Sequence, residues 1–279
     1  MEMRSSETRF LLNGAFYRMA AVEMGDPAAP PVICVHGLTR NGRDFDPLMS
    51  ALAERFRVIA PDLPGRGRSD WLPDGMLYQP LSYVQALAHL LAIVGRPVMW
   101  VGTSLGGICG MMIAAARGQP IARMVLNDIG PEIPEAALRR IRDYLLAAPE
   151  SFADLAALES HLRLIYAPFG SLADADWARM ARTSARPLPD GRLAFHYDPR
   201  IADPMRAAPP QAIGMWDLWE RIRIPVLAIR GQSSDLLLAD TFQRMMDSGA
   251  ASLTIAGAGH APALADRASQ QAIADFLSG

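Results

Sequence analysis

Ser104 is the residue whose surroundings most clearly indicate chemistry. It lies in Gly102-Thr-Ser-Leu-Gly106, between the apolar run 98–101 and a predicted helix over 108–117. A strand that passes through Gly-x-Ser-x-Gly into a helix is typical of a nucleophile elbow, a strained turn that exposes the serine hydroxyl. Flanking glycines avoid collisions there, and the helix N-terminus turns free N–H groups toward developing negative charge. We therefore expect Ser104 to be a nucleophile.

His260 is the histidine best placed to act as a base for Ser104. A serine hydroxyl is a poor nucleophile at neutral pH until a base takes its proton. His260 stands in the glycine-rich segment 257–262, directly after the predicted strand 252–255. If that strand is parallel to the run before Ser104, both side chains lie at the same sheet edge. We therefore expect His260 to be the general base.

Two backbone amides are expected to stabilise the oxyanion that forms when Ser104 attacks a carbonyl group. His36 ends the predicted strand 31–35, and a His-Gly turn in this position typically shapes a loop with N–H groups facing the nucleophile. We assign the donors to the N–H groups of Leu38 and Leu105. Each such donor typically lowers the barrier by about 3 kcal/mol.

Short apolar runs separated by helical patterns predict a doubly wound α/β fold, with a mostly parallel sheet covered on both faces. The alternation breaks over 130–223, where helical patterns continue without a buried-strand run. An insertion there is expected to cover the carboxyl ends of the strands, where such sheets bind ligands. We therefore expect an α/β core of residues 1–129 and 224–279 with a helical cap of residues 130–223. The predicted strands are 16–23, 31–35, 57–60, 98–101, 122–127, 224–229 and 252–255, and the predicted core helices are 45–55, 81–94, 108–117, 239–246 and 267–277.

The motifs at the predicted strand ends, taken together, resemble the α/β-hydrolase superfamily. They are His36-Gly37, the segment 62–69 (Asp-Leu-Pro-Gly-Arg-Gly-Arg-Ser), the turn around Ser104, and Gly259-His260, in this order. The resemblance covers almost the whole chain and is to capped bacterial serine esterases. It implies the α/β-hydrolase fold and the chain order serine, acid, histidine. Dehalogenases and epoxide hydrolases of this fold carry an aspartate where this chain has serine.

Two aspartates are candidates for the acid that would orient His260. Asp235 follows the first strand after the insertion, where the superfamily usually places this acid. However, the usual slot, three residues after the strand-end glycine, holds Ser234. Asp128 directly follows the strand before the insertion, and some capped bacterial esterases resemble this arrangement. We favour Asp128 and keep Asp235 as the alternative.

Composition excludes several classes of function. The chain has 279 residues, of which 51% are hydrophobic and 20% charged. A formal net charge of −2 without a polybasic run argues against nucleic acid or membrane surfaces as partners. Every basic residue is Arg, which excludes a lysine Schiff base and a Walker phosphate loop. We expect no cofactor and no metal.

A cytoplasmic location is expected from the N-terminus and the cysteines. The first residues are polar and lack a secretory pattern. Cys34 and Cys109 lie in apolar segments, where they are expected to be small core residues. The sequence leaves the oligomeric state open.

The expected reaction is hydrolysis of a small carboxylic ester, or a related acyl bond, through an acyl-enzyme on Ser104. Lactones, a dicarboxylate amide of the acetamidomethylene succinate type and C–C bonds of diketones stay open as alternatives, as does a small-molecule receptor of the same fold. The pocket rather than the serine turn selects the substrate. Arg43, for an anionic group, and Trp216 are the candidate substrate contacts.

Overall fold

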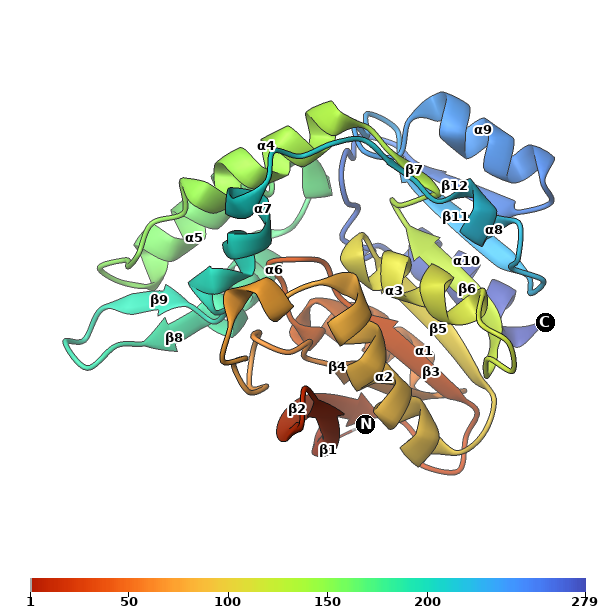
Figure 1. Cartoon of the computed structure of the whole chain (residues 1–279), viewed down its shortest axis with the longest axis horizontal. Helices are drawn as coiled ribbons and strands as arrows, with labels where there is room; N and C mark the ends of the chain where they lie inside the picture. Colours follow the sequence, from red (N-terminus) through yellow and green to blue (C-terminus); the bar gives the residue numbers. More distant parts are fainter. Residues whose placement is uncertain (1) are drawn as a thin grey trace.

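The computed structural model describes residues 2–279 and contains one eight-stranded sheet. Its strands follow the order β1-β2-β4-β3-β5-β6-β11-β12 (Figure 1). All neighbours from β4 to β12 are parallel, whereas β1 and β2 form an antiparallel hairpin at one edge. The strands span Arg4–Leu12 (β1), Ala15–Met24 (β2), Pro31–Val35 (β3), Arg57–Pro61 (β4), Val98–Thr103 (β5), Ile121–Asn127 (β6), Val226–Gly231 (β11) and Ala251–Ile255 (β12).

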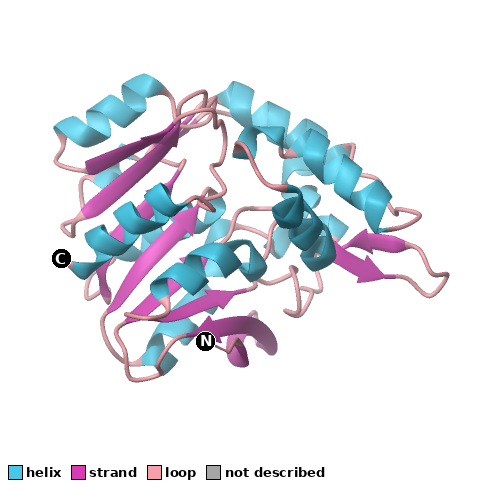
Figure 2. Cartoon of the chain, turned by 180° about the vertical axis from the view of Figure 1, so that it is seen from behind, coloured by secondary structure: helices cyan, strands magenta, loops and turns pink. Residues whose placement is uncertain are grey.

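Helices cover both faces of this sheet, which is why its central strands are apolar throughout (Figure 2). All five residues of β3 are buried. The side chains of α2 and α3 belong to the core on one face, together with α9, and those of α1 and α10 belong to the core on the other. These helices span Asp46–Leu52 (α1), Pro80–Val94 (α2), Leu105–Ala114 (α3), Ala239–Asp247 (α9) and Arg267–Ser278 (α10). The predicted doubly wound, mostly parallel sheet with helices on both faces is thus present.

The structure differs from the sequence prediction at one strand and at the start of one helix. The strand β1 was not expected, because its outer half is polar and only Thr8, Phe10 and Leu12 are buried. The helix predicted over 108–117 begins at Leu105, directly after Ser104. Its second and third residues are glycines with weak helix propensity, so their helical state depends on packing rather than on local preference.

The segment between β6 and β11 is mostly helical and lies beyond one end of the sheet (Figure 1). It also contains two short strand pairs, β7 with β10 and β8 with β9, that the hydrophobic pattern did not predict. Strands of two or three residues are too short to produce a periodic pattern. The elements are β7 (Glu132–Ile133), α4 (Glu135–Leu146), α5 (Leu155–Ile165), α6 (Asp174–Ser184), β8 (Ala185–Pro187), β9 (Leu193–Phe195), α7 (Asp203–Ala207), β10 (Ile213–Gly214) and α8 (Trp216–Trp219).

Two absences can be stated for residues 2–279. None of the helices there has both the length and the apolar character needed to cross a membrane. The same residues contain no cluster of three His, Cys, Asp or Glu side chains arranged to hold a metal ion.

The contact between α3 and β3 yields a stability prediction. A Cβ atom at Gly106 would overlap the carbonyl oxygen of Val35, so Gly106→Ala is expected to lower the free energy of unfolding by about 1–3 kcal/mol. Urea denaturation measures this difference. Gly214→Ala is the matched control, because a Cβ there meets no atom within 4 Å. Equal midpoints for the two variants would contradict the packing argument.

Candidate active site

Ser104 lies at the junction of β5 and α3 with a strained backbone. Its φ is 50° and its ψ is −114°, a combination that L-residues rarely adopt and that costs on the order of 1–3 kcal/mol. Neighbouring elements hold this conformation: the Ser104 N–H donates to the Asn127 carbonyl at 3.1 Å, and the Ser104 carbonyl accepts from the Gly107 N–H at 2.8 Å. A Cβ at Gly102 would lie 2.5 Å from the Gly106 carbonyl oxygen, so the turn requires glycine there. The hydroxyl is thereby fixed at the carboxyl end of the sheet.

His260 bridges Ser104 and Asp128. Its Nε2 lies 3.1 Å from Ser104 Oγ, and its Nδ1 lies 2.7 Å from Asp128 Oδ2. Asp128 is fully buried. An ionised carboxylate can only accept hydrogen bonds, so Nδ1 carries the ring hydrogen and Nε2 is left to accept from the serine hydroxyl. The three side chains form one chain of hydrogen bonds that can carry a proton away from Oγ.

The carboxylate of Asp128 has two further donors, from the end of β11 and the loop that follows it. The Gly231 N–H donates to Oδ1 at 2.7 Å, and the Ser234 hydroxyl donates to Oδ2 at 2.6 Å. Ser234 Oγ in turn accepts from the Leu237 N–H at 3.1 Å. These donors offset the desolvation of a buried charge. Ser234 stands where the superfamily usually has the acid, and the sequence pattern assigns no role to Ser234. The structure shows that its hydroxyl binds the Asp128 carboxylate.

The alternative acid, Asp235, lies elsewhere. Its carboxylate forms a two-point ion pair with Arg140 of α4, with distances of 2.5 Å to Nε and 2.8 Å to Nη2. Half of its side chain is exposed. Within residues 2–279 it makes no hydrogen bond to His260. Of the two candidates, Asp128 is the one in contact with the imidazole.

The loop after β3 runs beside Ser104. A Cβ at Gly37 would lie 3.8 Å from Ser104 Cβ. Among residues 2–279, the N–H groups of Leu38 and Leu105 have no hydrogen-bond acceptor. Free N–H groups next to a nucleophile can receive negative charge that develops on a substrate oxygen. The assignment of the oxyanion donors to these two amides stays a prediction.

His36 holds this loop rather than facing Ser104. Its Nδ1 donates to the Gly37 carbonyl at 2.7 Å, and its Nε2 accepts from the Leu63 N–H at 2.9 Å. Burial lowers the pKa of His36 to about 3. The ring is therefore neutral at physiological pH and serves as a fixed link between two loops.

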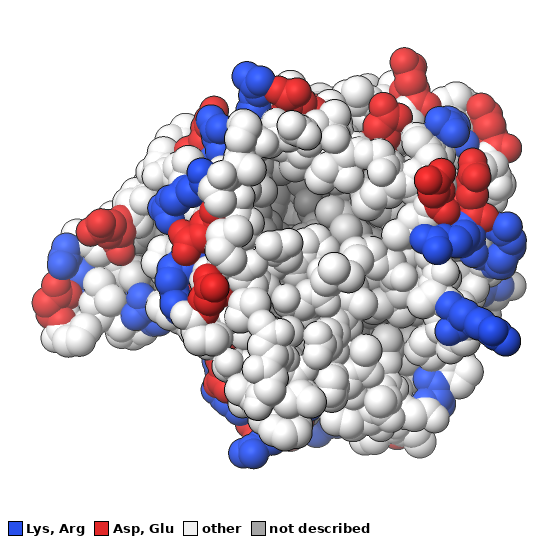
Figure 3. Space-filling model, in the orientation of Figure 1, with Lys and Arg blue, Asp and Glu red and all other residues white. Residues whose placement is uncertain are grey.

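A cavity opens at Ser104 and His260. It lies between the carboxyl-end loops of the sheet on one side and α4, α6 and the segment between α5 and α6 on the other. In Figure 3 the middle of the face that carries α2 and α3 is hollowed and nearly free of charged side chains, which gather on both flanks. The lining includes Leu38, Ile141, Tyr144, Tyr166, Phe169, Leu172 and Met180, and its charged members are Arg40, Asp44, Arg140 and Arg179.

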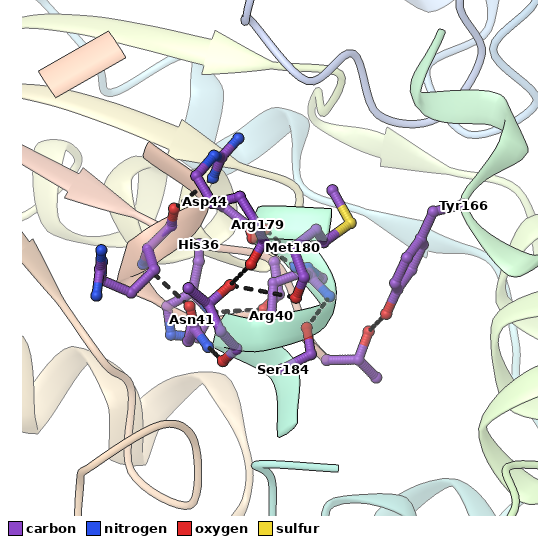
Figure 4. Close-up of polar contacts among 12 residues, drawn as sticks. His36, Arg40, Asn41, Asp44, Tyr166, Arg179, Met180 and Ser184 are labelled. Carbon is purple, nitrogen blue, oxygen red and sulfur yellow. Dashed lines mark hydrogen bonds and ion pairs between the residues drawn. The ribbon is translucent and has the colours of Figure 1, made fainter. Parts of the chain in front are cut away.

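Arg40 and Asp44 form a buried ion pair in the cavity wall (Figure 4). Two guanidinium nitrogens of Arg40 lie 2.8 Å and 2.6 Å from the Asp44 oxygens, and a third donates to Ser184 Oγ at 3.0 Å. Burial alone would lower the pKa of Arg40, but Asp44 outweighs it and the net shift is upward. Thr39 Oγ1 and the Tyr166 hydroxyl lie 2.6 Å apart in the same wall. These contacts connect the loop after β3 to the helical segment.

The two predicted substrate contacts do not line the cavity. Arg43 is paired with Asp46 at 2.8–3.0 Å. The indole of Trp216 donates to Glu132 at 3.2 Å, and the Arg244 guanidinium stacks on its ring at 3.6 Å. Arg43 thus pairs with a carboxylate three positions along the chain and Trp216 with a distant one, and their role as substrate contacts stays a prediction.

Comparison with known proteins identifies the family. The family model described as the alpha/beta hydrolase family matches residues 32–275. The chain belongs to this family. It is 39% identical over 275 residues to the 3-hydroxybutyrate-oligomer hydrolase of Cupriavidus necator, covering 94% of each chain. It is also 30% identical to the 2-(acetamidomethylene)succinate hydrolase of Mesorhizobium japonicum, covering 76% of this chain and 74% of the relative.

A solved structure supports the same family. An alpha/beta hydrolase from Novosphingobium aromaticivorans has a TM-score of 0.86 and 37% identity, covering 99% of this chain and 98% of that chain. The family and the relatives named above are hydrolases, which indicates that this protein is a hydrolase enzyme.

The contacts of the two aspartates predict different effects on the reactivity of Ser104. Asp128→Asn should favour the wrong imidazole tautomer and slow labelling by a fluorophosphonate by about 10⁴-fold. Asp235→Asn should leave the labelling rate within about threefold of wild type, because a partly exposed ion pair contributes little to the site. Mass spectrometry of the Ser104 adduct over time gives both rates. The reverse ranking would show that the wrong aspartate was chosen.

The buried His36 predicts a loss of stability in acid. The unfolded chain binds a proton near pH 6.5, but the folded chain does so only near pH 3, so the free energy of unfolding falls as pH drops through that window. From pH 7 to pH 5 the contribution of this one histidine is about 2 kcal/mol. Urea denaturation of His36→Gln should show a correspondingly smaller pH dependence. His89→Gln, at a half-buried histidine of α2, is the control and should retain the wild-type dependence.

Proposed function

We propose that this α/β hydrolase cleaves carboxylic esters through an acyl-enzyme on Ser104. The observation that carries the proposal is the continuous contact from Asp128 to His260 to Ser104, at 2.7 Å and 3.1 Å. A serine with a base at hydrogen-bond distance, and a buried acid behind that base, is the arrangement that activates a hydroxyl nucleophile.

Each step of the proposed reaction uses a group already described. His260 Nε2 takes the proton of Ser104 Oγ as Oγ bonds to the ester carbonyl carbon. The carbonyl oxygen becomes an oxyanion that faces the N–H groups of Leu38 and Leu105. The intermediate then collapses, and the alcohol leaves with the proton of His260. Water, deprotonated by His260, next attacks the acyl-enzyme, and the carboxylic acid and free Ser104 result.

Asp128 supports both halves of this cycle. When His260 holds the additional proton, its positive charge lies next to the Asp128 carboxylate. The negative charge of Asp128 stabilises that imidazolium without itself taking the proton. Its hydrogen bonds to Gly231 and Ser234 keep the carboxylate in place while the charge on the ring changes.

Short linear oligoesters of 3-hydroxy acids are the first substrates to consider. This choice rests on the 39% identity with a 3-hydroxybutyrate-oligomer hydrolase across 94% of each chain. The cavity at Ser104 has a mostly apolar lining with a few polar groups, as small-molecule sites do. A dicarboxylate amide is the second candidate, because the 2-(acetamidomethylene)succinate hydrolase is 30% identical. We further propose that residues 130–223 serve as a cap that determines which substrate enters.

The proposed reaction is tested with the linear dimer of 3-hydroxybutyrate. Wild type should release 3-hydroxybutyrate, and Ser104→Ala should lower kcat by about 10⁶-fold because the nucleophile is gone. Ser252→Ala, which removes an exposed hydroxyl in β12, is the control and should retain full activity. Chromatography of the products measures the rates, and 2-(acetamidomethylene)succinate is assayed in parallel. Undiminished turnover by Ser104→Ala would exclude the acyl-enzyme.

A further inference from the structure

The cavity wall has an excess of positive charge. Arg40, Arg140 and Arg179 line it, and among residues 2–279 Asp44 is the only carboxylate that does. Both oxygens of Asp44 are already occupied by Arg40. The wall therefore has no free carboxylate to offset the other two guanidinium groups.

Arg140 and Arg179 differ in how firmly they are paired. Arg140 makes two short contacts with Asp235, at 2.5 Å and 2.8 Å. Among residues 2–279, Arg179 has only one carboxylate neighbour, Asp176, at 3.4 Å. Its other contact is a 3.0 Å hydrogen bond from Nη1 to the Arg43 carbonyl oxygen, a neutral acceptor. Within the described residues, Arg179 Nε has no acceptor. Of the cavity arginines, Arg179 thus retains the most capacity to bind an anion.

The helix that carries Arg179 is held against the loop beside Ser104. Ser184, at the end of α6, accepts from Arg40 at 3.0 Å, and the Thr183 carbonyl accepts from the Asn41 side chain at 2.7 Å. Figure 4 shows Arg179 gathered with Arg40, Asp44 and Ser184. The Arg179 side chain is 22% exposed, so an ion pair made there is only weakly screened by water. The guanidinium is therefore held at a fixed place in the cavity wall.

We propose that Arg179 binds a carboxylate of the substrate, and that this hydrolase acts on esters that carry a free carboxylate in addition to the scissile bond. The inference rests on the proposed function, since it names the substrate class of the same site. A planar guanidinium with unused N–H donors matches a carboxylate at two points. An ester without a free carboxylate would leave the unused N–H donors of Arg179 without an acceptor in the cavity, which is a cost that selects against such an ester.

The test compares a charged and a neutral ester of equal shape. The free acid of the linear 3-hydroxybutyrate dimer carries the carboxylate on the leaving alcohol, and its methyl ester lacks that charge. Wild type should have the higher kcat/KM for the free acid. Arg179→Met should lower kcat/KM for the free acid by about 10- to 100-fold and for the methyl ester by less than about threefold. A second pair, 4-nitrophenyl hydrogen glutarate and its methyl ester, places the carboxylate on the acyl side.

The matched control is Arg182→Met. Arg182 is an exposed arginine on the same helix, and it is not part of the cavity lining. It should retain wild-type kcat/KM for all four esters. Arg140→Met is measured as well. If this variant, and not Arg179→Met, loses the preference for the free acid, then Arg140 binds the carboxylate and the proposal is wrong. Equal loss on charged and neutral esters in Arg179→Met would mean a structural role and would overturn the proposal.

Direct binding separates this proposal from the proposed reaction. Calorimetry with Ser104→Ala and free 3-hydroxybutyrate measures recognition of the carboxylate without turnover. Saturable binding that Arg179→Met weakens by about 10-fold or more would support the subsite even if wild type cleaves none of the esters. Absence of binding, or binding unchanged in Arg179→Met, would refute the subsite even if ester hydrolysis is observed.

Discussion

The buried carboxylate of Asp128 is the constraint on which the arrangement of the site depends. A charge without solvent is costly unless its lone pairs are occupied, and here two separate segments supply the donors. Gly231 and Ser234 come from the end of β11 and the loop after it, and His260 comes from the loop after β12. These partners are more than 100 residues away along the chain. The Asp128 carboxylate therefore has all its hydrogen-bond donors only when the parallel sheet is complete.

Backbone strain accompanies this carboxylate. Ser104 and Asp128 both adopt positive φ, at 50° and 54°. The Ser104 N–H donates to the carbonyl of Asn127, and the Asp128 N–H donates to the carbonyl of Ile229. Each strained residue is thus anchored to a neighbouring strand at the same sheet edge. Such conformations persist only where surrounding structure holds them, which is the situation expected of a pre-organised reactive site.

Sequence patterns predicted the parts of this molecule that depend on local order. Buried strands are continuous apolar runs, and the turn at Ser104 has a short signature, so the fold and the nucleophile candidate could be placed directly. The preference for Asp128 over Asp235 also agrees with the contacts of His260. The role of Ser234 is different, because it depends on a side chain that lies 106 positions away. No local pattern records such a contact.

The arginines near the cavity show the same limit of sequence-based prediction. Arg43 was chosen because it follows the loop near the nucleophile, yet its guanidinium is taken by Asp46 three positions along. Arg179 belongs to a helix 136 positions away, and its Nη1 donates to the backbone of Arg43. Proximity in sequence therefore identified a loop beside the cavity, whereas an arginine that lines the cavity comes from a distant helix. Which guanidinium N–H donors stay unused is decided by contacts that only the folded chain defines.

The buried pair of Arg40 and Asp44 has a consequence for how this protein can change. Arg40 lies in the loop after β3, and its guanidinium reaches Ser184 in the helical segment between β6 and β11. The helical segment therefore cannot be exchanged independently of the loop after β3. Transplanting the corresponding segment of a relative would leave a buried guanidinium without its hydroxyl partner. Recombination between relatives should succeed only when the loop after β3 and the helical segment are inherited together, as one unit of exchange.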